Sequence, residues 1–372
     1  MIYLDHAATT EPHEEVIAAM QLSLEDHYCN PSAVYATAEA DAVREARAAV
    51  AALLGTSDRN IVFTGGGSEA DNLALKGAVD AADGQHVVTT TIEHAAVVET
   101  ATWLEDHGID VTRVAPGEDG RVDPADVADA IRPDTAIVSV MHANNETGVV
   151  QPLEAIGEIT DEHGVLFHSD TVQSAGKVPI DVDELGLDLA SLSAHKFYGP
   201  KGVGALYVRD GVELEPIIHG GGQERGLRSG TENVPGIVGM GKAAALAVDD
   251  MAERGERLRE LRDELVATLR TETDAALVGH PERRLPGYAM MGFPELSGTD
   301  LVQAFADHDI AVSSGSACHS GDRSPSRVLM EMGIDTNLAF GAVRFSLGRE
   351  TTSEDVQYVK DQLGNVLEEA TQ

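Results

Sequence analysis

The sequence predicts an α/β protein with a large domain, built on a mostly parallel sheet flanked by helices, and a smaller α+β domain. From about residue 60 to about residue 210, short apolar runs alternate with helical patterns, which is typical of parallel strands connected by helices. After about residue 250 this alternation stops, and a long amphipathic helix is followed by a hairpin pattern. With 372 residues, 42% of them hydrophobic, the chain is long enough for two domains.

The expected elements of the large domain alternate between strand and helix. Ile61–Phe63 predicts a strand, and a helix follows from Ser68, which forms a capping-box pattern with Asp71. Ligands of such sheets bind at the carboxyl ends of the strands, so we expect the chemistry there. Further strands are expected at 86–91, 110–114, 136–141, 165–168, 189–192 and 204–208, and further helices at 95–107, 124–131 and 153–163.

The smaller domain is expected to begin with an amphipathic helix at 251–270, which carries a stripe of leucines. A hairpin formed by 275–279 and 288–293 is predicted next, because turn-forming residues separate two apolar runs. The remaining expected elements are a helix from Asp300, strands at 310–313 and 343–346, and a last helix that starts at the capping-box pair Thr351 and Glu354.

Composition excludes several classes of protein. The net charge of −37 excludes ordinary nucleic-acid binding, because phosphate groups would be repelled. No apolar run approaches the roughly 20 residues that a membrane span needs, and Met1–Thr10 lacks the basic and apolar regions of a signal peptide. We therefore expect a cytoplasmic protein without membrane contact. The acidic, lysine-poor composition further suggests adaptation to high salt, as a hypothesis about habitat.

The chain contains only two cysteines, Cys29 and Cys318. They form neither a CxxC pair nor a zinc-ligand spacing, so we expect no disulfide framework and no metal site. Cys29 has no supporting context, and an inert buried thiol is the expectation for it.

Polar side chains follow the carboxyl ends of successive predicted strands. A helix cap, a turn or a solvated group would explain each one alone, but together they predict a ligand site at one edge of the sheet. The turn 64–68 adds three glycines before a helix, an arrangement that favours phosphate although it is weak evidence by itself. In chain order, the polar side chains are Glu93, His94, Asn144, Asn145, Glu146, Asp170, Gln173, Ser193, His195 and Lys196.

Two of these side chains fit the needs of pyridoxal phosphate (PLP). This cofactor requires a lysine that forms a Schiff base and a carboxylate that keeps the ring nitrogen protonated, so that the ring can act as an electron sink. Lys196 and Asp170 follow consecutive strands and fit these roles. Lys201 is the rival lysine, and it ranks second because it lies in a turn that enters the strand 204–208.

The sequence closely resembles the cysteine desulfurases of the iron–sulfur-cluster and nitrogen-fixation type, which belong to the class V aminotransferase family and have PLP fold type I. The resemblance covers essentially the whole chain. The polar loop from Cys318 to Pro325 resembles that of the branch whose sulfur-carrying loop is long and mobile. The matching motifs lie at 3–10, 30–32, 91–94, 144–148, 193–202, 228–231, 313–318 and 344–349.

The resemblance implies a role for each matching residue. Lys196 would bind the cofactor covalently, Asp170 would pair with its ring nitrogen, and His94 would stack on the ring and assist proton transfer. Cys318 would receive the sulfur, and Arg344 would bind the substrate carboxylate; without the resemblance, a surface salt bridge would explain Arg344. The other implied contacts are Gln173 near the ring O3′, Asn145 near that oxygen and the substrate, Gly67, Ser68, Ser193 and His195 at the phosphate, and Thr231 reaching in from the other subunit of a homodimer.

The implied reaction converts L-cysteine to L-alanine and leaves the sulfur on Cys318 as a persulfide. The sulfur would serve iron–sulfur cluster assembly, tRNA thiolation or both, with a cluster scaffold or a thiolation protein as acceptor. The resemblance also implies that residues 14–252 form the large PLP-binding domain, and that residues 1–13 and 253–372 form the small domain carrying the cysteine loop.

Two positions depart from the family pattern. The phosphate loop 65–68 is Gly-Gly-Gly-Ser where Ser-Gly-Ala-Thr is usual, and Ser68 keeps the hydroxyl. His319 follows the cysteine where a small polar residue is common. Two alternatives remain open: another PLP lyase of the same fold, such as a selenocysteine lyase or a kynureninase-like enzyme, and a catalytically silent scaffold for cluster-assembly proteins. The presence of Lys196, Asp170 and Cys318 argues against the scaffold.

Overall fold

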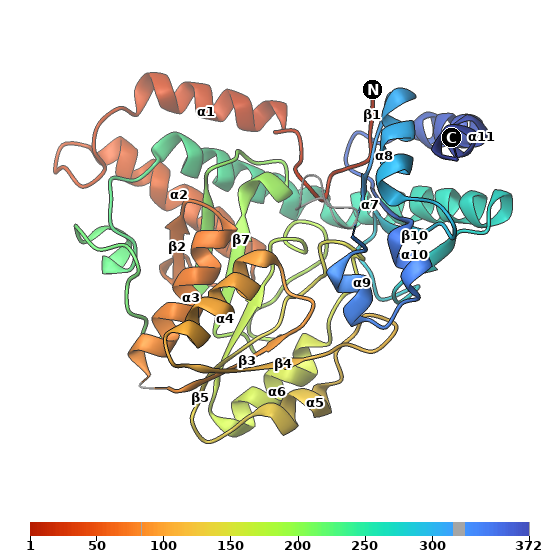
Figure 1. Cartoon of the computed structure of the whole chain (residues 1–372). Helices are drawn as coiled ribbons and strands as arrows, with labels where there is room; N and C mark the ends of the chain where they lie inside the picture. The colour runs from red at the N-terminus through yellow and green to blue at the C-terminus, as the bar shows by residue number, and fades with distance from the viewer. Residues whose placement is uncertain (83, 315–323, 372) are drawn as a thin grey trace.

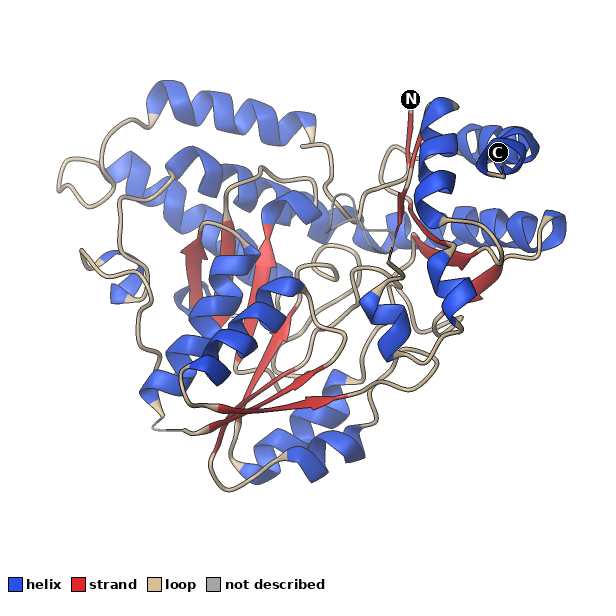
Figure 2. Cartoon of the chain, viewed as in Figure 1, coloured by secondary structure: helices blue, strands red, loops and turns tan. Residues whose placement is uncertain are grey.

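The computed structural model describes residues 1–82, 84–314 and 324–371. Cys318 and His319 therefore lie outside the described residues. Figure 1 shows a large sheet surrounded by helices and, beyond it, a smaller assembly that contains both termini. Figure 2 shows the same division by element type, with the strands of the large sheet fanned between helices.

The central sheet has seven strands in the order β2-β8-β7-β6-β5-β3-β4. The neighbours from β7 to β4 pair in parallel, whereas β8 runs antiparallel to both β2 and β7. The α/β fold class and the mostly parallel sheet are thus confirmed. The strands are β2 (Ile61–Thr64), β3 (His86–Thr90), β4 (Asp110–Val114), β5 (Thr135–Ser139), β6 (Leu166–Asp170), β7 (Leu189–Ser193) and β8 (Gly204–Val208).

Helices cover both faces of this sheet. Neighbouring strand residues point to opposite sides, so Val62 joins a core with α3 and α4 while Phe63 joins a core with α2 and α7. Burial on both faces explains why the strands are continuous apolar runs in the sequence. The helices are α1 (Glu14–Asp26), α2 (Thr37–Leu53), α3 (Gly67–Ala81), α4 (Ala95–Asp106), α5 (Pro124–Ala130), α6 (Leu153–His163) and α7 (Val234–Glu272), with short 3₁₀ helices η1 (Asp58–Asn60), η2 (Ala194–Lys196) and η3 (Gln223–Gly226).

The smaller assembly is built on an antiparallel sheet in the order β12-β13-β10-β9 and a parallel pair, β1 with β11. The predicted hairpin is confirmed, because β9 pairs antiparallel with β10. A separate apolar core lies between these strands and the helices α7, α8 and α11. The elements are β1 (Ile2–Tyr3), β9 (Ala276–Val278), β10 (Tyr288–Gly292), β11 (Ile310–Ala311), β12 (Ser313–Ser314), β13 (Ala342–Ser346), α8 (Gly298–Asp307), α9 (Arg327–Glu331), α10 (Thr336–Phe340) and α11 (Ser353–Ala370).

Both predicted capping boxes were wrong. Helix α3 begins at Gly67 after Gly66, without a side-chain cap, and Asp71 is buried in the helix instead. The box of α11 is Thr352 with Asp355, one residue after the predicted pair. Thr351 does not cap α11, because its hydroxyl oxygen accepts a hydrogen bond from the Gly348 N–H.

Two further expectations need correction. The strand predicted at 310–313 is two short strands, β11 and β12, which belong to different sheets. The helix predicted at 251–270 is the second half of α7, which begins at Val234 and runs without a break past residue 252. The domain boundaries at 13/14 and 252/253 stay a prediction.

The N-terminal segment contacts both sheets. Leu4 and His6 exchange backbone hydrogen bonds with Ser346 of β13, at 2.8 and 3.1 Å. A few residues later, the Thr10 N–H donates to the His195 carbonyl oxygen at 2.9 Å. The segment therefore bridges the small sheet and the end of β7. No helix in the described ranges is both long enough and apolar enough to cross a membrane.

Close packing of α2 against α7 generates a stability prediction. A Cβ atom on Gly241 would lie 2.4 Å from Ala46 Cα, so Gly241→Ala must push the helices apart. Overpacking of this kind costs typically about 1–3 kcal/mol. Gly364→Ala is the matched control, because Gly364 is exposed on α11 with open space around the new methyl group. We expect Gly241→Ala to lower the melting temperature and Gly364→Ala to leave it unchanged or raise it, and equal effects would contradict the packing argument.

Candidate active site

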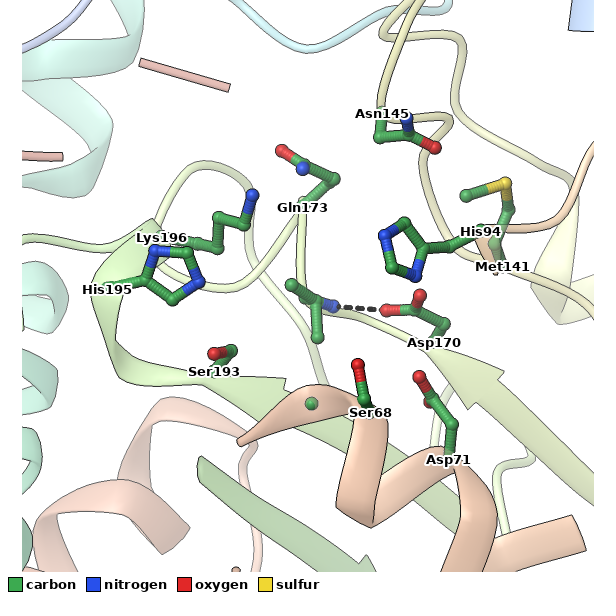
Figure 3. Close-up of a pocket in the computed structure, with 12 residues that line it drawn as sticks. Ser68, Asp71, His94, Met141, Asn145, Asp170, Gln173, Ser193, His195 and Lys196 are labelled. Atoms are coloured by element: carbon green, nitrogen blue, oxygen red, sulfur yellow. Dashed lines mark hydrogen bonds between the residues drawn. The ribbon is translucent and has the colours of Figure 1, made fainter. Parts of the chain in front are cut away.

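A cavity of about 240 Å³ opens at the carboxyl ends of β3, β5, β6 and β7, where the sequence predicts a ligand site. Figure 3 shows its side chains converging on one space, with Ser68 and Asp71 on helix α3. The cavity brings together every predicted cofactor-binding residue except Thr231. It is lined by Gly67, Ser68, Asp71, His94, Met141, Asn145, Asp170, Val172, Gln173, Ser193, His195 and Lys196.

One end of the cavity suits an anion. The first turn of α3, at Gly67 and Ser68, has no side-chain cap, so its N–H groups are available to a ligand. Ser193 and His195 line the same cavity. Burial, followed by the nearby charges of Lys196 and two other lysines, lowers the pKa of His195 to about 4, so its imidazole is neutral at pH 7. The donor set is that of a phosphate site built on a helix terminus.

The other end of the cavity holds carboxyl groups. Ligand atoms of Asp71, His94 and Asp170 lie within 4.8 Å of one another. Burial raises the pKa of Asp71 well above its usual range, and the nearby Asp170 raises it further. Burial also raises the pKa of Asp170, but His94, the Val172 N–H at 2.8 Å and Lys196 oppose that shift. The negative charge therefore belongs on Asp170, and Asp71 keeps a proton. These groups have the spacing of a cation site, but a protonated Asp71 removes charge that a cation would need.

Helix α4 fixes the orientation of His94. As the N-cap residue, His94 accepts a hydrogen bond from the Ala96 N–H to its Nδ1 at 3.1 Å. A neutral imidazole that accepts at Nδ1 carries its proton on Nε2. The ring is thus held over the cavity, beside Asp170 in Figure 3, with a defined tautomer.

Lys196 projects into the cavity from the 3₁₀ helix η2, directly after β7. Its Nζ donates to the carbonyl oxygens of Ala7 and Ala8, at 2.7 and 2.8 Å. Gln173 contacts the same N-terminal segment, because its Nε2 donates to the Ala7 carbonyl at 3.1 Å. The Tyr288 hydroxyl donates to Gln173 Oε1 at 2.6 Å and fixes which way the amide points.

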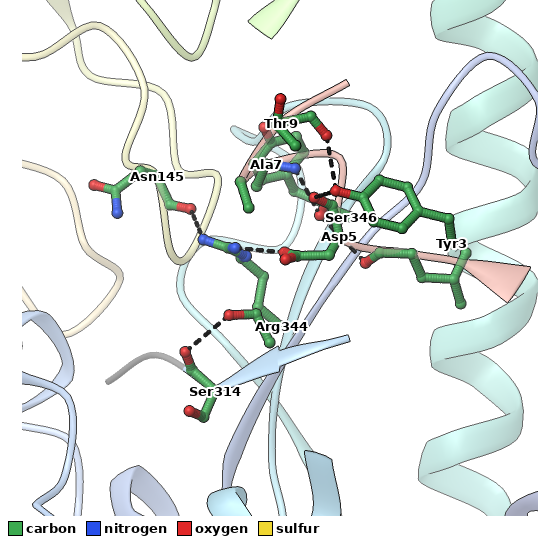
Figure 4. Close-up of polar contacts among 12 residues, drawn as sticks. Tyr3, Asp5, Ala7, Thr9, Asn145, Ser314, Arg344 and Ser346 are labelled. Carbon is green, nitrogen blue, oxygen red and sulfur yellow. Dashed lines mark hydrogen bonds and ion pairs between the residues drawn. The ribbon is translucent and has the colours of Figure 1, made fainter. Parts of the chain in front are cut away.

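Arg344 lies beside this cavity rather than on the surface. It is buried on β13, and its Nη2 forms an ion pair with Asp5 Oδ1 at 2.6 Å. Its Nη1 donates to the Asn145 carbonyl oxygen at 2.8 Å. Figure 4 shows the guanidinium held between these two segments. Its buried Nε has no hydrogen-bond partner, so the group keeps donor capacity for a ligand carboxylate.

Several predicted or rival residues lie elsewhere. Thr231 is exposed and does not line the cavity of its own chain, and Lys201 is exposed. Cys29 is a half-buried free thiol, whose pKa is raised by burial and then by Glu39. That direction disfavours a thiolate and fits the inert role expected for it.

Sequence reasoning missed several contributors to the site. Asp71 was taken for a capping residue, and Met141 and Val172 were not considered. Tyr288 and the carbonyl groups of Ala7 and Ala8 reach the site from segments far away in the chain. Only the polar character of Asp71 on an otherwise apolar helix face carried a signal that could have been found beforehand.

Comparisons with known proteins agree with this geometry. Residues 2–359 match the aminotransferase class-V family. The chain belongs to this family of PLP-dependent enzymes. It is 49% identical to a cysteine desulfurase IscS of Anaeromyxobacter dehalogenans, over 96% of this chain and 90% of that protein. The predicted family and fold class are confirmed.

Solved structures are similar over nearly the whole chain. A NifS-like protein superposes with a TM-score of 0.93 at 37% identity and covers 99% of both chains. SspA, solved in complex with cysteine, has a TM-score of 0.84 at 37% identity and covers 93% of this chain and 99% of its own.

Buried Glu93, next to His94, generates a pH prediction. Its Oε1 accepts from the Thr90 hydroxyl and the Met141 N–H, at 2.8 and 2.9 Å, and burial raises its pKa to about 8. The folded protein thus binds a proton that the unfolded chain releases near pH 4.5, so this residue's contribution to stability is lost as pH rises from about 4.5 through 8. Glu93→Gln, which imitates the protonated acid, should stabilise the protein at pH 9 by at least about 1 kcal/mol and have little effect at pH 5.

Melting curves of both proteins from pH 5 to 9 check this expectation. Exposed Glu99→Gln on α4 is the control, and it should shift the curve equally at all pH values. A stability difference for Glu93→Gln that does not grow with pH would contradict the buried protonated state.

Proposed function

We propose that this protein is a PLP-dependent cysteine desulfurase, which converts L-cysteine to L-alanine and transfers the sulfur to Cys318 as a persulfide. One observation carries the proposal: Lys196 and Asp170 face a single cavity whose other end is the uncapped start of α3. A ligand with a phosphate, a carbonyl group and a ring nitrogen fits these three points. The cysteine desulfurase relatives and the cysteine-bound neighbour support the substrate.

Each end of the cavity has a task in holding the cofactor. The α3 terminus at Gly67 and Ser68 would bind the phosphate, together with Ser193 and His195, and Thr231 of a partner subunit would complete this cup. The Asp170 carboxylate would pair with the ring nitrogen, and Gln173, oriented by Tyr288, would contact the ring oxygen with Asn145. When bound, PLP supplies an electron sink that makes the substrate α-proton removable.

Proton transfer falls to two side chains. Lys196 would hold the cofactor covalently, and its amine, when free, would be the group that accepts the substrate α-proton. His94 would stack on the ring, and its Nε2 proton faces the cavity, where it can assist. Both groups are basic nitrogens on rigid parts of the sheet edge, which suits accurate proton transfer.

Arg344 and Asn145 would position the substrate. The unpartnered Nε of Arg344 and its remaining Nη protons can bind a carboxylate, and the Asp5 ion pair and the Asn145 carbonyl fix the guanidinium in place. A planar carboxylate matches this donor set. The substrate amine would then point toward Lys196 and its sulfur away from the sheet.

The segments on either side of Cys318 approach this carboxylate site. Ser313, in β12, pairs with Arg344 of β13. On the other side, the Ser326 hydroxyl donates to Glu146, the neighbour of Asn145. On both sides of position 318, described residues thus contact the proposed carboxylate site or a residue next to it, which supports Cys318 as the sulfur acceptor.

The wider setting belongs to the same proposal. The enzyme would act in the cytoplasm as a homodimer and pass its sulfur to an iron–sulfur scaffold or a tRNA-thiolation protein. The acidic surface would suit a saline cytoplasm, since salt screens repulsion between carboxylates. A selenocysteine lyase is the second candidate, and the tests below also distinguish it and the silent scaffold.

Labelling of the cofactor lysine tests the core of the proposal. After borohydride reduction, we expect the pyridoxyl group on the peptide that contains Lys196. Lys196→Ala should abolish the label and the yellow colour, whereas Lys201→Ala should keep both. A label on Lys201 would overturn the assignment, and a wild type that never binds PLP would favour the scaffold.

Sulfur transfer is tested at the two thiols. After cysteine treatment, mass spectrometry should find one added sulfur atom on the Cys318 peptide. Cys318→Ser should retain the PLP spectrum and lose nearly all alanine production from cysteine, because no thiolate receives the sulfur. Cys29→Ser is the matched control and should keep the wild-type rate. Undiminished desulfuration of cysteine by Cys318→Ser would refute the mechanism, and activity on selenocysteine alone would favour the lyase.

A further inference from the structure

Lys177 contacts the main chain of Lys196, the proposed cofactor lysine, and has no part in the reaction described above. It follows β6 and the tight turns of 171–177, and its side chain is half-buried. Its Nζ donates to the carbonyl oxygens of Gln173 and Lys196, both at 2.9 Å. One ammonium group thus holds the main chain of two residues that face the cavity.

The backbone is shaped to permit this contact. Gly176, at φ +70°, adopts a left-handed conformation, and a Cβ atom on it would lie 2.8 Å from Phe197 Cβ. Only glycine lets the turn approach the chain just after Lys196 so closely. The side chain of Lys177 then reaches both carbonyl groups from a fixed starting point.

Lys177 has no carboxylate beside its amino group in the described part of the chain. No ion pair joins it to a carboxylate among the residues that the structure describes. Burial lowers its pKa well below the ordinary value, and Lys196 and then Arg254 lower it further. Arg254 itself is paired with Asp250 on α7. Lys177 and Lys196 are therefore two amino groups in one partly desolvated region, where a positive charge on one disfavours a positive charge on the other.

The other titratable groups of this region do not neutralise Lys177. His6 and His195 both have a pKa of about 4, lowered first by burial, and are neutral at pH 7. Asp170 interacts electrostatically with Lys196, and in the PLP-bound enzyme the proposed pairing with the ring nitrogen would offset its charge. The groups that face the two lysines are His6 on the N-terminal segment, His94 before α4, Asp170 on β6, His195 on η2, Tyr198 and Lys201 in the following loop, Arg254 on α7 and Tyr288 on β10.

We propose that Lys177 is a positioning residue for Lys196, which fixes the main chain of Lys196 and Gln173 and places a positive charge that favours the uncharged form of the Lys196 nitrogen. An amine must be uncharged to bind the cofactor or accept a proton, and a neighbouring cation is one of the ways in which proteins achieve this. The proposal rests on the proposed function, because it assigns Lys196 as the cofactor lysine.

Three substitutions separate the charge from the contacts. Lys177→Arg keeps the charge, Lys177→Gln keeps hydrogen-bond donors without it, and Lys177→Met removes both. The readout is a pH titration of the visible absorption of the PLP-bound enzyme, which reports protonation of the nitrogen that joins Lys196 to the cofactor. Like charges disfavour each other, so loss of the Lys177 charge should raise the midpoint by about one pH unit in the Gln and Met variants. The Arg variant should stay near the wild-type midpoint.

The outcomes distinguish this inference from the proposed function. A Gln or Met variant that binds PLP on Lys196, as borohydride mapping reports, and titrates with the wild-type midpoint would overturn the role of Lys177. If the Met variant does not fold, the Gln variant decides. A pyridoxyl label on a lysine other than Lys196 in the wild type would instead refute the proposed function. A raised midpoint in the Gln and Met variants, together with a wild-type midpoint in the Arg variant, supports the proposed effect of the charge. A merely structural role of Lys177 would not change the midpoint.

Discussion

The geometry of the site depends on the N-terminal segment, which ties two separate sheets together across the cavity. On one side, Leu4 and His6 bond to Ser346 of β13, and Asp5 holds Arg344. On the other, Thr10 bonds to the main chain of His195, at the end of β7. Between these attachments, the Ala7 carbonyl accepts from both Lys196 and Gln173. The residues 4–10 thus connect Lys196 with Arg344, the proposed carboxylate-binding residue, through hydrogen bonds to both.

Within this framework, burial determines which side chains of the site are ionised at pH 7. Asp71, which lines the cavity, and Glu93, next to His94, are both buried, and burial is the largest cause that raises the pKa of each and keeps them protonated at pH 7. Burial likewise lowers the pKa of His168 to about 3 and keeps it neutral between Ser139 and Ser191. For Asp170, the neighbouring His94 and Lys196 oppose the effect of burial on its pKa, and Asp170 is the acid that we propose to pair with the ring nitrogen. The negative charge is therefore on Asp170 because burial keeps Asp71 and Glu93 protonated, and not because one strong attraction holds it there.

Much of the fold and of the cavity followed from local patterns. The strands were recognisable because burial on both faces makes them continuous apolar runs, and their carboxyl ends point to the same edge of the sheet. Long-range contacts had no such signal: Tyr288 reaches Gln173 from 115 residues away, and Asp5 reaches Arg344 from 339 residues away. The start of α7 was missed because its close packing requires Gly239 and Gly241, which a propensity scale counts against a helix. The α3 cap was misjudged because the helix begins at Gly67 after the glycine N-cap Gly66, which has no side chain to form a cap.

Lysine is scarce in this chain, yet Lys177 and Lys196 lie together beside the cavity. A chain with a net charge of −37 carries only six lysines, and two of them, Lys177 and Lys196, are joined through a hydrogen bond from one side chain to the main chain of the other. Arginine could supply a positive charge at either position, but it stays protonated and cannot serve as an amine base. The proposed role of Lys196 therefore requires lysine. At Lys177 the amino group donates to two carbonyl oxygens at once. The two lysines thus have different proposed tasks at one edge of the sheet: Lys196 acts through its amine, and Lys177 acts through its two hydrogen bonds and its charge.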